Sequence, residues 1–358
     1  MKDHHCKTYP YFIHATLTIQ SHTPPPPLDK SVFRREENRL PRDKYDQLPS
    51  LAEIWPNYPP LPGTDGSRFL NIQLTEAIQT GQGKRSQVYA VRCTDSNDPL
   101  GLPTNHTIVA KFYDPTYYEI EYLSDNPFVE ADYEYSHESA IYTRCSGIQG
   151  TSIPRFFGSY TLRITRPCEQ ATRLVRLILI EYINGMPMSQ LIPGTFTRQQ
   201  RQSILRQIVD AESALYARDI LLRDFHQRNI VIEPNEVKEG GGVRVVIIDQ
   251  GLSTIGRTWR PWDKEYEDQW FPGVYISPLL RWRVSYGRHE KFEDWIDWQW
   301  QDWLEMEWKD TEAVITEAQR LLWSRRILPS TTTSHENSTV SPKDIVTNAD
   351  ACEIGRPY

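Results

Sequence analysis

The sequence of 358 residues lacks the cysteine pattern of a disulfide-bonded or zinc-binding protein. Its cysteines form no C-x-x-C pair and have no histidine at ligand spacing. An odd, dispersed set is typical of free thiols in a reducing compartment, so we expect neither a disulfide framework nor a zinc site. The five cysteines are Cys6, Cys93, Cys145, Cys168 and Cys352.

Long apolar runs and an excess of positive charge are also absent. The longest apolar run, from Leu177 to Ile183, is interrupted by Glu181 and is too short to cross a bilayer. The first twenty residues lack the sustained apolar core of a signal peptide. We therefore predict an intracellular protein of the cytoplasm or nucleus with no membrane contact. The net charge of −7, from 40 basic and 47 acidic residues, gives no sign of a nucleic-acid partner.

Two segments with little hydrophobic patterning flank a predicted domain. Residues 1–65 form a proline-rich leader that includes Pro24–Pro27. We expect this leader to be largely disordered, because proline removes backbone donors and fixes φ. Residues 329–358 form a Ser/Thr-rich tail that we expect to be mobile.

The first part of the domain, residues 66–180, has the composition of short β-strands. Segments rich in Val, Ile, Tyr and Phe are separated by Gly, Asn, Asp and Pro, and one helix is predicted over Phe128–Cys145. The predicted strands are Leu70–Ile78, Gln87–Cys93, Ile108–Tyr113, Phe156–Thr161 and Leu174–Ile180.

The second part, residues 181–328, is dominated by a helical period. Thr197 is predicted to cap a long helix, and two strands follow it at Ile230–Glu233 and Val243–Ile248. The order of these elements predicts an α+β fold with two lobes and a cleft between them. A cluster of tryptophans beyond residue 290 is interpreted first as packing anchors and second as a partner surface.

A glycine-rich turn lies between two of the predicted strands. Gly81 and Gly83 allow a tight turn and bring N–H groups against phosphate oxygens, where a side chain would collide. Ser86 and Val88 follow in the same segment. An ordinary hairpin turn is the alternative interpretation.

Lys111 lies inside an apolar predicted strand, Val109-Ala110-Lys111-Phe112. A lysine here either extends to solvent from an edge or grips the phosphates of a nucleotide, held by a carboxylate. Glu138 on the predicted helix is the first choice for that carboxylate and Glu134 is the second.

Two acidic turns supply the remaining polar groups. Asp224 and Asn229 are five residues apart in one loop, so both side chains can face one point. The aspartate can orient or deprotonate a hydroxyl, and the asparagine oxygen and Asp249 can bind Mg²⁺. Gly251 then lets the chain turn away from the site. A polar turn with local hydrogen bonds is the alternative for the first loop.

In this order, the motifs G-x-G-x-x-S-x-V, V-A-K, a helix glutamate, R-D-x-x-x-x-N and D-Q-G resemble the protein-kinase signature set. The resemblance spans about residues 70–285 and extends to divergent, fungal-type kinase-like proteins. It implies a two-lobed protein-kinase-like fold, with a small β-rich N-lobe that has one helix and a larger helical C-lobe. It also implies that adenine bonds to the backbone at Glu181 and Ile183, with Ile180 at the back of the pocket. Gly81, Gly83, Val88 and Lys111 are the other ATP-binding residues that it implies.

The sequence departs from the family pattern at several points. Leu222 replaces the usual histidine, Gln250 replaces the phenylalanine of D-F-G, and Leu279 replaces the glutamate of A-P-E. His226 makes the catalytic loop similar to that of aminoglycoside and choline phosphotransferases.

Three functions follow from these residues. The first is an ATP- and Mg²⁺-dependent kinase that transfers the γ-phosphoryl to a Ser or Thr hydroxyl of a protein. Here Lys111 with Glu138 would hold ATP, and Asp224 would orient the acceptor. The second is a kinase of the same type with a small-molecule hydroxyl acceptor, which His226 favours. The third is a non-catalytic module that binds a nucleotide or a partner, which the replaced motif residues favour.

Overall fold

The computed structural model describes seven stretches of the chain. They are residues 10–29, 58–95, 106–118, 126–165, 172–235, 242–257 and 270–324. The Ser/Thr-rich tail and most of the proline-rich leader lie outside these stretches. No helix in these stretches is long and apolar enough to cross a membrane.

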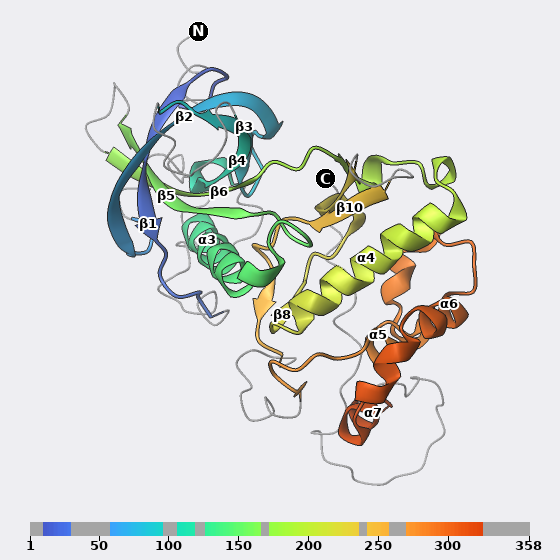
Figure 1. Ribbon diagram of the computed structural model, residues 1–358. Helices are drawn as coiled ribbons and strands as arrows, with labels where there is room; N and C mark the ends of the chain where they lie inside the picture. The colour runs from blue at the N-terminus through green and yellow to red at the C-terminus, as the bar shows by residue number, and fades with distance from the viewer. Residues whose placement is uncertain are drawn as a thin grey trace, which may run out of the picture.

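Six antiparallel strands close into a barrel in the order β1-β2-β3-β4-β6-β5 (Figure 1). Closure depends on β1, because this strand pairs with β2 on one side and with β5 on the other. The strands are β1 Thr16–Thr23, β2 Thr64–Gln79, β3 Gln87–Cys93, β4 Thr107–Tyr113, β5 Phe156–Thr165 and β6 Thr172–Glu181.

Strand alternation divides β4 between two environments. Ala110 and Phe112 point into the barrel, where they join an apolar core with residues of the other five strands. Lys111 and Tyr113 therefore lie on the outer face, toward helix α3 (Pro127–Arg144). Asn126 caps this helix by accepting a hydrogen bond from the N–H of Phe128.

Helix α4 (Arg198–Tyr216) begins where the sequence predicts. Thr197 accepts a hydrogen bond from the N–H of Gln200, and the Gln200 side chain accepts one from the N–H of Thr197, which completes a capping box. A three-stranded sheet in the order β10-β9-β7 and a two-stranded pair of β11 and β8 accompany this helix. These strands are β7 Met186–Pro187, β8 Ile220–Leu221, β9 Ile230–Asn235, β10 Gly242–Ile247 and β11 Thr254–Ile255.

Short helices complete the described part of the chain. The α-helices are α5 Pro278–Arg281, α6 Trp300–Glu307 and α7 Glu317–Ser324. The 3₁₀ turns are η5 Pro115–Tyr117, η6 Ser146–Ile148, η7 Met188–Gln190, η8 Pro193–Thr195, η9 Gln227–Asn229, η11 Val284–Tyr286, η12 Arg288–Trp295 and η13 Lys309–Val314. Trp295, Trp300, Trp303 and Trp308 are buried here, so their interpretation as packing anchors is confirmed.

The prediction of a two-lobed protein-kinase-like fold is wrong. The β-rich part is a closed six-stranded barrel, and the part after β6 mixes one long helix with short strands and short helices. One apolar core runs without a break from the outer face of the barrel, through α3, to α4 and the tryptophans. The barrel and the part after β6 therefore share this core, in addition to the separate core inside the barrel.

The strand β1 explains much of this error. The prediction of a disordered leader is wrong for Thr16–Thr23, because these residues form the strand that closes the barrel. Leu17 and Ile19 are buried, which gives β1 the alternating pattern of a half-buried strand. The individual predicted strands and the helix over Phe128–Cys145 are confirmed, with ends that differ by a few residues.

Candidate functional site

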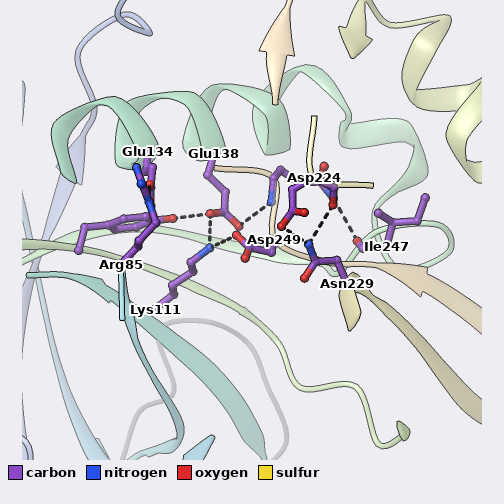
Figure 2. A network of polar contacts seen from close by, with 10 residues as sticks. Arg85, Lys111, Glu134, Glu138, Asp224, Asn229, Ile247 and Asp249 are labelled. Atoms are coloured by element: carbon purple, nitrogen blue, oxygen red, sulfur yellow. Dashed lines mark hydrogen bonds and ion pairs between the residues drawn. The ribbon is translucent and has the colours of Figure 1, made fainter. Parts of the chain in front are cut away.

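Lys111 joins two carboxylates that come from distant parts of the chain. Its Nζ lies 2.6 Å from Oε2 of Glu138 on α3 and 2.6 Å from Oδ1 of Asp249, which follows β10 (Figure 2). The strand, the helix and the loop thus meet at one ammonium group. Glu138, the first of the two predicted partners, is therefore the glutamate that pairs with Lys111.

Two further groups, neither of them predicted from the sequence for this role, hold Glu138. The Tyr113 hydroxyl donates to Oε2 at 2.6 Å, and the N–H of Gln250 donates to Oε1 at 3.4 Å. Tyr113 stands two positions after Lys111, so the period of a strand places both side chains on one face. That spacing is the signal that identifies Tyr113. Gln250, at the position of the missing phenylalanine, is fully buried.

The cluster is buried at one end and open at the other. The Glu138 and Lys111 side chains are 0% and 7% exposed, whereas the Asp249 side chain is 46% exposed. Burial opposes the charge of Lys111, but Asp249 and Glu138 together raise its pKa above the usual value. Burial likewise opposes the charge of Asp249, but Lys111 lowers its pKa. Both groups are therefore charged at neutral pH.

Asp224 and Asn229 form a second polar cluster. The Asn229 Nδ2 donates to the carbonyl oxygen of Asp224 at 2.9 Å and to its Oδ2 at 2.8 Å. Arg228 NH2 contacts the other carboxylate oxygen, Oδ1, at 2.7 Å. The predicted convergence of Asp224 and Asn229 on one point is confirmed.

Backbone pairing brings the two clusters to the same place. Ile247 pairs with Ile230 at the end of the β9–β10 ladder, and the N–H of Ile248 donates to the carbonyl of Asn229 at 2.9 Å. The next residue is Asp249, which has a φ of 60°, a conformation that aspartate tolerates better than most residues. Figure 2 shows Asp249 between the Lys111 pair and the Asp224–Asn229 pair.

The oxygens at this point suit Mg²⁺ better than a softer metal. Asn229 uses its side-chain nitrogen on Asp224, so its Oδ1 points away from that contact (Figure 2). Within the described residues, no three His, Cys, Asp or Glu side chains converge as a metal cage. Mg²⁺ does not require one, because it binds through one or two protein oxygens together with water and phosphate. Asn229 and Asp249 are the residues that fit this role.

The glycine-rich turn has the expected backbone conformation but a different use of its N–H groups. Gly81 and Gly83 have φ values of 110° and 79°, which disfavour a side chain. The N–H of Gly81 donates to the Gln87 side chain at 2.8 Å, and the N–H of Gly83 donates to the carbonyl of Tyr117 at 2.8 Å. Both groups are thus bonded within the protein, and phosphate binding by either one requires this loop to move.

Arg85 in the same turn was not identified from the sequence. Its guanidinium pairs with Glu134 on α3 (Figure 2). It also pairs with Glu130 on the same helix, at 3.0 Å. Glu134, the second choice for Lys111, therefore holds the glycine-rich turn instead. Burial raises the pKa of Glu134 to about 7, although Arg85 opposes this.

The segment expected to bind adenine is tied to the β9–β10 sheet. The Glu181 carboxylate pairs with both terminal nitrogens of Arg244 at 2.8 and 3.0 Å, and the N–H of Glu181 donates to the carbonyl of Arg155 at 2.9 Å. No described residue accepts a hydrogen bond from the N–H of Ile183, which leaves one donor for a base. Val88 lies opposite Lys111 in the β3–β4 ladder, so its side chain shares the outer face.

Comparisons of the chain with protein-family models and with curated proteins find no match. Its function must therefore be argued from geometry. The structure brings together Lys111, Glu138 and Asp249, and it places Asp224 and Asn229 beside them.

Proposed function

We propose that this chain is a phosphotransferase that uses Mg²⁺–ATP and transfers the γ-phosphoryl group to a hydroxyl, first of all that of a Ser or Thr side chain. One observation carries the proposal. A buried lysine lies 2.6 Å from a half-exposed aspartate, next to an asparagine–aspartate pair. Such a set of one cation and several oxygens can hold a triphosphate and its metal.

Lys111 supplies the positive charge. An ammonium group has three N–H donors, and two of them reach Glu138 and Asp249. The third is the donor for a phosphate oxygen. Glu138 fixes the ammonium group in place, since Tyr113 and Gln250 hold its carboxylate.

Asn229 and Asp249 would hold Mg²⁺, which neutralises the charge of the phosphates when it is bound. Asp224 is the base that orients the acceptor hydroxyl. Its carboxylate already accepts bonds from Arg228 and Asn229, and a carboxylate has about four acceptor positions, so room for a hydroxyl remains. Its side chain is 27% exposed, and an acceptor can reach it from solvent.

A nucleotide-binding protein without transferase activity is the second candidate. The observation that favours it is the use of the Gly81 and Gly83 N–H groups inside the protein, together with the Arg228–Asp224 ion pair. Both features restrain groups that a transferase has to aim at its substrates.

Transfer from γ-labelled ATP tests the proposal and separates the two candidates. Purified protein would be incubated with Mg²⁺ and either a basic protein or a panel of amino sugars as acceptor. We expect wild type and Asp302→Asn, a change at an exposed aspartate on α6, to transfer label. Asp224→Asn is expected to lose about 100-fold or more of the rate while it still binds ATP. Equal rates for Asp224→Asn and wild type would refute the role of Asp224. Nucleotide binding without transfer by wild type would support the second candidate.

A further inference from the structure

A cavity of about 250 Å³ has Tyr113 in its wall. It is enclosed by residues 58–60, the end of β4, the beginning of β6 and the first turns of α3. None of the residues proposed to bind ATP or Mg²⁺ lines it. The cavity is therefore a separate feature that the proposed function does not use.

The walls of the cavity are mainly apolar and aromatic. Tyr58 stacks on Phe128 with ring centroids 4.9 Å apart, and Pro59, Pro60 and Ala131 add further apolar surface. An apolar cavity of about 150 Å³ is large enough to bind benzene. The space here is large enough for one aromatic ring that carries a short substituent.

A buried guanidinium in the wall has a donor without an acceptor. Arg176 is only 6% exposed, and its two terminal nitrogens donate to Thr161 and to the carbonyl of Leu61. Its Nε has no hydrogen-bond partner among the residues that the structure describes. The nearest ion-pair contact of Arg176, to Asp65, is long at 3.8 Å. A buried N–H donor of a charged group favours a ligand that brings an anionic acceptor.

The two carboxylates of the wall, Asp132 and Asp114, make their close contacts with groups other than Arg176. Both oxygens of Asp132 face the N–H of Leu61, at 3.1 and 3.2 Å. Asp114 pairs with Arg173 at 2.8 Å. Arg176 is thus the cation of the cavity whose charge is least compensated by a close carboxylate.

We propose that this cavity binds a small aromatic carboxylate, with the ring against Tyr58, Phe128 and the two prolines and the carboxylate on the guanidinium side of Arg176. Tyr113 forms part of the wall and also donates to Glu138, so the ligand would lie next to the residues that hold Lys111.

Binding of phenylacetate to the full chain tests this proposal without any nucleotide. The comparison ligand for phenylacetate is 2-phenylethanol, which keeps the ring and the chain length but replaces the carboxylate with a neutral hydroxyl. Binding would be measured by calorimetric titration and by ligand-observed NMR. We expect saturable binding of phenylacetate below about 10 mM, and binding of the alcohol about tenfold weaker or less.

Two leucine substitutions in α3 provide the matched protein variants. Ala131→Leu fills the cavity from the helix without touching Arg176, and we expect it to weaken phenylacetate binding about tenfold or more. Ala140→Leu lies on the same helix away from the cavity and should bind as wild type does.

Each failure has a definite meaning. The proposal is overturned by absence of saturable binding to wild type, by equal affinity for acid and alcohol, or by unchanged affinity in a folded Ala131→Leu. If Ala131→Leu does not fold, the comparison of acid and alcohol on wild type decides. Because the binding measurement uses no ATP, its outcome does not depend on whether the protein is a transferase.

Discussion

Lys111 combines a structural role with the role proposed for it in nucleotide binding. Its ammonium group compensates a carboxylate, Glu138, that is fully buried, and it also reaches Asp249 at the open end of the cluster. A buried carboxylate that loses its cation is costly, because the remaining charge lies in a medium that solvates it poorly. The residue that would bind phosphate therefore also holds α3 against the barrel.

Lys111→Met should lower the free energy of unfolding by about 3 kcal/mol, because Glu138 then keeps only the Tyr113 and Gln250 donors. Urea denaturation measures this change. Lys309→Met, at an exposed lysine, is the matched control and should change stability by less than about 0.5 kcal/mol. If both substitutions changed the free energy of unfolding by a similarly small amount, the buried Glu138 carboxylate would not need the charge of Lys111.

Individual site residues were predictable where the signal is local. The spacing of Asp224 and Asn229, and the order of Lys111 and Glu138 along the chain, needed no knowledge of the barrel. Arg85 was not predictable, because its pairing with Glu134 depends on how the turn after β2 folds over α3. A sequence does not encode that contact at any fixed spacing.

Among the elements, β1 has the largest effect on the architecture. Its alternating residues were present in the sequence, but the prolines that follow it outweighed them in the prediction of a leader. Its pairing with β5 joins residues more than one hundred positions apart, which no local pattern specifies. The closed barrel was therefore the part of the fold that sequence reasoning missed.

His22 of β1 makes the stability of this closure depend on pH. Its ring is 5% exposed and lies 2.6 Å from the Tyr135 hydroxyl on α3. Burial, followed by the charge of Arg176, lowers the pKa of His22 to about 4. The usual value is about 6.5, so the unfolded chain binds more protons between these values. The contribution of His22 to stability should therefore fall by roughly 3 kcal/mol as pH falls from about 6.5 to about 4, whereas the raised pKa values of Glu134 and Asp132 contribute in the opposite direction.

Urea denaturation across this range measures the His22 effect. Relative to wild type, His22→Gln should lose less stability as pH falls from about 6.5 to about 4, whereas His106→Gln, at an exposed histidine, should follow the wild-type profile. Equal slopes for His22→Gln and wild type would show that His22 does not titrate in this way.

The continuous outer core predicts that the described parts unfold together. Ile208 of α4 is fully buried in the same cluster as Val109 of β4 and Trp303 of α6. Two regions that share one core lose it in a single cooperative step.

Ile208→Ala should therefore lower the stability of the barrel and of the tryptophan-rich region equally, by about 3 kcal/mol. Tryptophan fluorescence follows the second region, and amide hydrogen exchange of β3 and β4 follows the first. Ile208→Ala could lower the stability reported by tryptophan fluorescence and leave amide hydrogen exchange in the barrel unchanged. That result would show that the two regions unfold independently.

Stabilisation by Mg²⁺–ATP is the most direct test that these polar groups form a nucleotide site. A ligand at about 100 times its Kd stabilises a folded protein by about 2.7 kcal/mol, which thermal unfolding detects easily. The geometry predicts a clear rise in the melting temperature of wild type with millimolar Mg²⁺–ATP, a smaller rise with ATP and EDTA, and loss of most of the effect in Asp249→Asn. An unchanged melting temperature of wild type at millimolar Mg²⁺–ATP would contradict it.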